Sequence, residues 1–196
     1  ESEIFENAMV LKEKGFQHIL ILTGEAKKTV EMPYFRSMLK QLRPHFSSIG
    51  MEVQPLDVDD YSELIQLGLD QVVVYQETYH RDTYAMVHLS GKKRRFDYRL
   101  DTHDRLGKAG VYRMSLGALL GLYDWRYEAL AMIDHVDYLR KRYWKTHLSV
   151  SFPRITTVFD PNHALHKVTD RDLVQLIAVF RCLFPDIGIT LSTRES

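Results

Sequence analysis

Several short stretches of the chain place carboxylate, guanidinium and hydroxyl groups directly after apolar runs. They are Thr23-Gly24-Glu25, Gln76-Glu77 with Arg81, Ser151 with Arg154, and Thr193-Arg194. A carboxylate can pair with an ammonium group, and a neighbouring glycine lets the ligand approach the backbone closely. A guanidinium can hold a carboxylate through two hydrogen bonds. These residue types therefore suit a ligand that has both an amino and a carboxyl group.

Each of these groups also has a purely structural interpretation. Glu25 fits a solvated loop, and Arg154 fits an ordinary surface position equally well. Glu77 can accept hydrogen bonds from hydroxyl groups such as those of a ribose, or it can form an ion pair with Arg81. Polar loops at strand ends explain one or two such clusters, but they explain less well the number that this chain contains.

Two further candidates are weaker. Asp160, His163 and His166 have residue types that bind metals, but H-x-x-H without an additional ligand indicates a metal site only weakly. Cys182, the only cysteine, lies in a helical pattern near Phe180, so we expect a packed thiol rather than a nucleophile. A single cysteine excludes an internal disulfide and is typical of a reducing cytoplasm.

The composition of the chain excludes several classes of protein. The chain has 196 residues, of which 45% are hydrophobic and 27% charged, with a formal net charge of zero. This mixture excludes intrinsic disorder, and a net charge of zero provides no global positive field, so we expect no nucleic-acid partner. No apolar run has the length of a membrane-spanning helix, so we expect no membrane partner.

Alternating strand and helix patterns must position the polar groups. Strands are predicted at 18–23, 49–53, 71–75, 112–120, 148–152 and 187–191, with helical patterns between them and one before the first. Asp57 is predicted to cap one helix, and Thr169 with Asp172 forms a capping box before another. The stretch 76–101 is predicted to be a long polar connection.

This alternation predicts an α/β fold of parallel βαβ units. A doubly wound sheet and a (β/α) barrel both fit, but no G-x-G-x-x-G turn follows the first strand. A parallel barrel brings the carboxyl ends of its strands to one face, where the polar clusters would meet. We therefore predict a single domain, residues 1–196, that is part of a parallel (β/α) barrel.

The polar clusters and their neighbours closely resemble the 2-iminoacetate synthase family, the tyrosine lyases of bacterial thiamine biosynthesis within the radical S-adenosylmethionine (SAM) superfamily. The stretches that carry the resemblance are TGE at 23–25, MEVQPL at 51–56, YQETYHRDTY at 75–84, LGALLGLYDWR at 116–126, SVSFPR at 149–154 and LSTRES at 191–196. The resemblance covers essentially the whole chain.

The resemblance implies a radical SAM barrel with SAM and a 4Fe-4S cluster as cofactors. It implies cleavage of the Cα–Cβ bond of L-tyrosine to 2-iminoacetate (dehydroglycine) and p-cresol. It also implies thiazole synthase as a protein partner, and an electron donor such as flavodoxin or ferredoxin. Two other readings remain open. One is the hydrogenase-maturation tyrosine lyase or a related aromatic amino acid lyase, and the other is a noncatalytic amino-acid-binding barrel module.

The resemblance also implies roles for individual residues. Gly24, Glu25, Gln76, Glu77 and Arg81 would bind SAM, with Gly24-Glu25 contacting its amino group. The apolar strand at 117–122 would lie beside the adenine. Ser151 and Arg154 would hold the tyrosine carboxylate, and Thr193 and Arg194 would line the substrate side.

The chain departs from the family in one respect. It has no C-x-x-x-C-x-x-C, and a single cysteine cannot supply the three thiolates of the cluster. We therefore expect a central fragment, an incomplete barrel of about six strands that lacks the first strand and the last barrel units. Without cluster ligands, the fragment is expected to be inactive by itself.

Overall fold

The computed structural model of the chain describes residues 2–23, 31–155 and 166–191. Within these ranges, six strands form one sheet in the order of the sequence, and their recorded pairings are parallel. The strands are β1 (His18–Leu22), β2 (Ser48–Glu52), β3 (Gln71–Val73), β4 (Arg113–Gly117), β5 (His147–Ser151) and β6 (Gly188–Thr190). The helices are α1 (Ser2–Glu13), α2 (Met32–Leu42), α3 (Val58–Gln66), α4 (Arg81–Val87), α5 (Phe96–Leu100), α6 (Thr102–Ala109), α7 (Trp125–Arg142) and α8 (Asp170–Leu183), with a 3-10 turn at Lys92–Arg94. The predicted alternation of parallel strands and helices is therefore present.

The chain divides into two compact units. Unit 1 consists of Glu1–Val74 and Thr102–Met114, and unit 2 of Tyr75–Asp101 and Ser115–Ser196. The prediction of a single domain stays a prediction.

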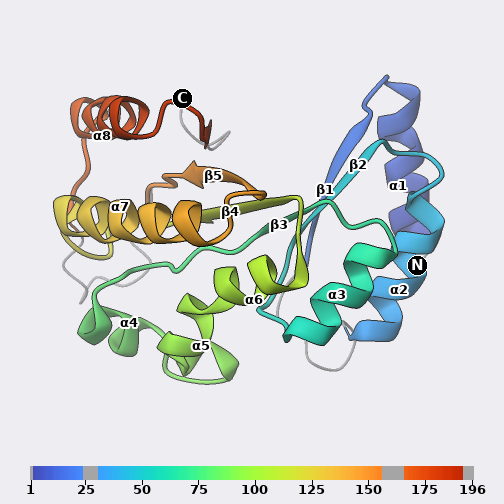
Figure 1. Ribbon diagram of the computed structural model, residues 1–196, viewed down its shortest axis with the longest axis horizontal. Coiled ribbons are helices and arrows are strands. Elements are labelled where there is room, and N and C mark those ends of the chain that lie inside the picture. Colours follow the sequence, from blue (N-terminus) through green and yellow to red (C-terminus); the bar gives the residue numbers. More distant parts are fainter. Residues whose placement is uncertain (1, 24–30, 156–165, 192–196) are drawn as a thin grey trace. The chain divides into compact units, whose positions relative to one another are not determined.

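The core of unit 1 follows from the spacing of apolar residues in α2. Phe35, Leu39 and Leu42 recur at helical spacing and are fully buried. Figure 1 shows α1 and α2 beside β1 and β2 in this unit. Ile49 and Met51, which are two residues apart in β2 and therefore project from the same face of the sheet, are fully buried as well.

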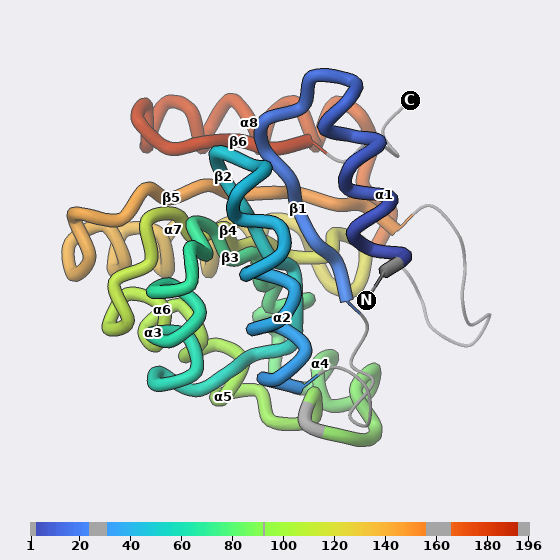
Figure 2. Tube along the Cα trace, turned by 90° about the vertical axis from the view of Figure 1, so that its right-hand side faces the viewer, coloured from blue at the N-terminus to red at the C-terminus, as the bar shows by residue number. Residues whose placement is uncertain are grey.

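Unit 2 contains the long helix and the capped helix that the sequence indicates. Met132, Val136 and Leu139 form the buried stripe of α7, which lies beside β5 in both views (Figures 1 and 2). Figure 2 shows α8 running beside β6. Thr169 and Asp172 form the predicted capping box at the start of α8, with both reciprocal hydrogen bonds present.

Three details differ from expectation. The stretch 76–101 is not an irregular connection but contains α4 and α5, because Tyr84 is buried against Phe96 and its hydroxyl donates to the Lys93 carbonyl at 2.5 Å. Asp57 stands at the N-cap position of α3, but its side chain makes no capping hydrogen bond. Cys182 is exposed, because it lies on the solvent side of α8 rather than on the buried stripe.

Candidate functional site

The site is built from the backbone that continues past β3, β4 and β5 in unit 2. The Gln76 N–H donates to the Gly117 carbonyl at 2.9 Å, and the Leu119 N–H donates to the Glu77 carbonyl at 2.7 Å. On the other side, the Leu120 N–H donates to the Pro153 carbonyl at 2.8 Å, and Leu120 forms a parallel bridge with Arg154. The stretch 117–120 thus lies between the turn after β3 and the turn after β5. The structure brings Gln76, Glu77, Ser151 and Arg154 to the same ends of neighbouring strands.

Gln76 is the polar side chain in this region that is least satisfied. It is 2% exposed, and neither its amide oxygen nor its amide nitrogen has a hydrogen-bond partner among the described residues. Burying an amide without a partner costs about 1–3 kcal/mol, so natural proteins rarely leave one in this state. An unpartnered buried amide at a strand end is suited to binding a polar ligand.

Glu77 has an unusual backbone and a well-defined set of partners. Its φ is +72°, in the left-handed region that residues with a side chain seldom adopt. Its carboxylate accepts from Arg99 at 3.1 Å and from Lys93 at 3.2 Å. Arg99 is buried, and its Nε also donates to the Tyr75 carbonyl at 2.6 Å.

Arg81 lies outside this group of charges. Its guanidinium pairs with Asp97 at 2.6 Å and stacks on Phe96, and both members of the ion pair are largely exposed. The guanidinium holds the pKa of the Asp97 carboxyl below its usual range. The alternative of a Glu77–Arg81 ion pair is therefore wrong, because α4 and α5 give each charge a different partner.

Ser151 and Arg154 stand at the end of β5. Ser151 is buried, and its carbonyl lies so close to Gly117 that a Cβ on this glycine would approach it to 2.5 Å. Glycine is thus required where β4 and β5 come together. The Arg154 guanidinium reaches the start of α8, where it donates to the Val168 carbonyl at 3.2 Å and to Asp170 at 2.8 Å.

Sequence reasoning missed Glu128, which is fully buried on α7. Its carboxylate accepts from the Thr78 hydroxyl and from the Tyr79 N–H, the latter at 2.8 Å. Burial raises the pKa of Glu128, and these two hydrogen bonds oppose that rise. A signal was available, because Glu128 lies one helical turn before Met132 on the apolar stripe, where a carboxylate is out of place.

Tyr79 and His135 continue this buried network. The Tyr79 hydroxyl and His135 Nδ1 lie 2.9 Å apart. Burial lowers the pKa of His135 to about 4, and it raises the pKa of Tyr79 far above its ordinary value. Both rings are therefore neutral near pH 7.

Aromatic rings surround the start of α4. His80 stacks on Tyr123 with 3.7 Å between ring centroids, and Tyr127 meets both rings edge-on. His166, one of the candidate metal ligands, packs against Tyr123 at 5.3 Å. Within the part of the chain that is described, no group of three or more His, Cys, Asp or Glu side chains is placed to hold a metal ion.

Six of the residues named from the sequence fall outside the described ranges. They are Gly24, Glu25, Asp160, His163, Thr193 and Arg194.

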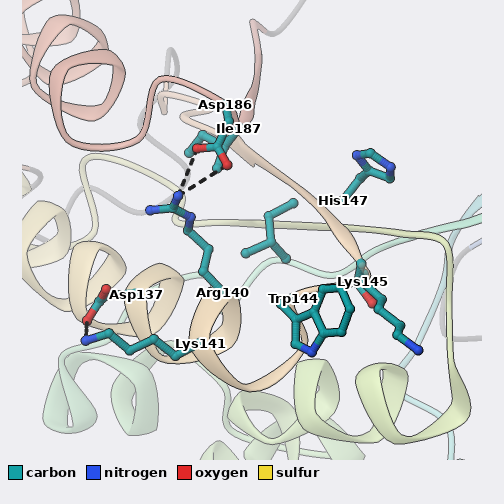
Figure 3. A pocket seen from close by; sticks show the side chains of 10 residues that line it. Asp137, Arg140, Lys141, Trp144, Lys145, His147, Asp186 and Ile187 are labelled. Atoms are coloured by element: carbon teal, nitrogen blue, oxygen red, sulfur yellow. Dashed lines mark hydrogen bonds and ion pairs between the residues drawn. The ribbon is translucent and has the colours of Figure 1, made fainter.

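A cavity of about 580 Å³ lies elsewhere in unit 2 (Figure 3). It is lined by the end of α7 and by residues at the amino ends of β5 and β6, among them Arg140, His147 and Asp186. Arg140 is held by Asp186 at 3.0 and 3.2 Å, and Lys141 by Asp137 at 2.5 Å. None of the described candidate site residues lines this cavity.

Comparison with known proteins shows which sequences this chain resembles. Over 197 residues, the chain is 49% identical to 2-iminoacetate synthase from Escherichia coli (strain K12) and 46% identical to 2-iminoacetate synthase from Salmonella typhimurium (strain LT2). The resemblance to 2-iminoacetate synthase is confirmed. Each alignment includes 100% of this chain and 52% of the relative, so the chain spans about half the length of the curated relatives it matches.

Two further comparisons agree with the likeness to 2-iminoacetate synthase. Residues 151–196 match the Biotin and Thiamin Synthesis associated domain family. The FeFe-hydrogenase maturase HydG from Carboxydothermus hydrogenoformans has a similar structure, with a TM-score of 0.89 and 32% identity over 100% of this chain and 46% of that chain. The predicted fold class, α/β with parallel strands of the radical SAM barrel type, is confirmed.

Proposed function

We propose that this chain is part of a radical SAM lyase that cleaves the Cα–Cβ bond of L-tyrosine to 2-iminoacetate and p-cresol. The observation that carries the proposal is the likeness to 2-iminoacetate synthase along the whole chain. The geometry of unit 2 supports it, because four of the residues that the resemblance assigns to ligands, Gln76, Glu77, Ser151 and Arg154, lie at neighbouring strand ends.

The residues present fit SAM. Gln76 offers a buried amide that has no hydrogen-bond partner among the described residues, and Glu77 is fixed beside it in a left-handed backbone conformation. Gly24, Glu25 and Arg81 complete the proposed binding set. When bound, SAM and a reduced 4Fe-4S cluster supply the radical chemistry of this reaction class.

The residues present do not fit the cluster. The chain has one cysteine, and this cysteine is exposed on α8. Cluster ligands must therefore come from outside this chain, and the chain alone is proposed to be inactive.

We assign the tyrosine carboxylate to Ser151 and Arg154, with Thr193 and Arg194 on the substrate side. Arg154 is already bonded to Asp170, an exposed partner that a substrate carboxylate can replace. Arg154→Ala is expected to weaken tyrosine binding strongly and SAM binding little, as measured by calorimetry on the complete gene product. Equal losses for both ligands would count against this assignment.

The proposed partners are thiazole synthase, which would receive 2-iminoacetate, and an electron donor such as flavodoxin or ferredoxin. Among the described residues, none of the helices combines the length and the hydrophobicity of a membrane-spanning segment. A cytoplasmic location is proposed from the presence of a single cysteine.

The direct test is anaerobic reconstitution of the complete gene product with iron and sulfide, followed by incubation with SAM, a reductant and tyrosine. We expect 5′-deoxyadenosine and p-cresol in the products. Formation of 5′-deoxyadenosine without p-cresol would contradict the substrate. Because HydG also resembles this chain, the fate of the two-carbon product is followed too. The resemblance implies that the hydrogenase-maturation lyase converts this product to cyanide and carbon monoxide, so their release would favour that alternative.

A further inference from the structure

The turn at residues 76–80, which we name the β3 turn, has a backbone shape that the surrounding structure must enforce. Glu77 adopts a φ of +72°, which costs a residue with a side chain about 1–2 kcal/mol. On one side, the backbone beyond β4 holds the turn through the bonds from Gln76 to Gly117 and from Leu119 to Glu77. Such a strained conformation persists only when contacts on the other side fix it as well.

Glu128 supplies the contacts on that other side. One carboxylate oxygen accepts from the Thr78 hydroxyl, and the other accepts from the Tyr79 N–H at 2.8 Å. The Thr78 oxygen in turn accepts from the His80 N–H at 3.1 Å. A single side chain of α7 thereby fixes three consecutive residues of the turn.

The bonds continue from the β3 turn into the helix that follows it. His80 is the N-cap of α4, and its Nδ1 accepts from the Thr83 N–H at 3.3 Å. The hydrogen bonds of Glu128 are therefore connected, through Thr78 and His80, to the start of α4.

The helix that carries Glu128 does not need a carboxylate at this position. Asp124 already caps α7 by accepting from the N–H groups of Arg126 and Tyr127. Glu128 occupies a fully buried place on the apolar stripe, where an aliphatic side chain would stabilise the helix and its packing better. The carboxylate is thus explained by the turn it holds and not by α7.

We propose that Glu128 is a positioning residue that holds the β3 turn in the conformation in which Gln76 and Glu77 meet SAM. This proposal rests on the proposed function. It identifies Glu128 as a residue that acts through the β3 turn without touching the ligand.

The test compares SAM and tyrosine affinities of the complete gene product by calorimetry, with tyrosine titrated at saturating SAM. Glu128→Gln keeps the shape of the side chain but presents an NH2 group where a carboxylate oxygen accepts. It is expected to raise the Kd for SAM about tenfold, the loss of one charged hydrogen bond, and to leave the Kd for tyrosine unchanged. Thr78→Val removes the hydroxyl from the same contact and should act in the same direction.

The double variant distinguishes one shared contact from two separate effects. Because Thr78 and Glu128 act on the turn together, the combined loss of SAM affinity should be smaller than the sum of the single losses. Asp137→Asn is the matched control, since it removes a partly exposed carboxylate from the same helix, and among the described residues this carboxylate bonds to Lys141. It should leave both affinities at the wild-type value.

Hydrogen exchange of the Tyr79 amide reports on the turn independently of SAM, and it should be faster in Glu128→Gln. Faster exchange with wild-type SAM affinity, or equal weakening of both ligands, would overturn the positioning role. Unchanged exchange would overturn the contact itself. If exchange is faster in Glu128→Gln than in the wild type but the wild-type protein never binds SAM, the proposed function is overturned, and with it the ligand assigned to the turn. If Glu128→Gln does not fold, Thr78→Val decides by the same two readouts.

Discussion

Glu77 combines a left-handed backbone with a carboxylate shared between Arg99 and Lys93. Since Arg99 is buried, removing the carboxylate leaves its charge less well compensated in a region that excludes water. Glu77→Gln is expected to lower the free energy of unfolding, measured by urea denaturation, by about 2 kcal/mol. Asp97→Asn breaks the exposed pair with Arg81 and serves as the control, with no measurable change expected. Similar effects for the two variants would show that Glu77 and Arg99 are not a buried pair.

His135 makes the stability of the protein depend on pH in a predictable direction. Its pKa is about 4 in the folded protein, below its ordinary value of 6.5, so the unfolded chain binds the extra proton between these values. The stability that comes from keeping this ring neutral is therefore fully present well above pH 6.5 and is lost as the pH falls towards 4. Its loss should reduce the free energy of unfolding by about 2 kcal/mol between pH 7 and pH 5. Urea unfolding of His135→Gln should show a shallower dependence over this range, and parallel curves for the two proteins would refute the assignment.

At the scale of elements, the start of α8 shows how a local signal fixes a helix end. The Thr169 hydroxyl accepts a hydrogen bond from the Asp172 N–H, and the Asp172 carboxylate accepts one from the Thr169 N–H. Thr169→Ala should lower the free energy of unfolding by about 1 kcal/mol, while Thr169→Ser should retain most of it. Chemical denaturation of both variants checks this, and equal losses would mean that the methyl group and not the hydroxyl stabilises the helix.

Sequence patterns predicted the elements that have a strong period and missed those that depend on distant contacts. The stripe of Met132, Val136 and Leu139 predicted α7, because side chains at that spacing share one face. The helices α4 and α5 were missed, since each is short and is fixed by contacts such as that between Tyr84 and Phe96. The role of Glu128 was also hidden, because its donors lie about 50 positions earlier in the chain and no local pattern connects them.

At the scale of the whole molecule, topology accounts for why part of the site was predictable. Parallel strands in sequence order place their carboxyl ends side by side, and polar residues at 76–77 and 151–154 therefore had to approach one another. Topology does not specify the partner of each charge, so the sequence left a Glu77–Arg81 ion pair open as an alternative, whereas the structure gives the two residues different partners. Those pairings depend on α4 and α5, which come between neighbouring strands.

The central claim is that the end of β3 is built for SAM, and Gln76 tests it most directly. In Gln76→Leu, a buried amide without a protein partner among the described residues is replaced by an apolar side chain of similar size. The free energy of unfolding without ligand should stay the same or rise, because no protein hydrogen bond is lost. Calorimetric titration of SAM into the complete gene product should give a Kd at least about tenfold higher than the wild-type value. A variant that binds SAM as tightly as the wild type would contradict the account.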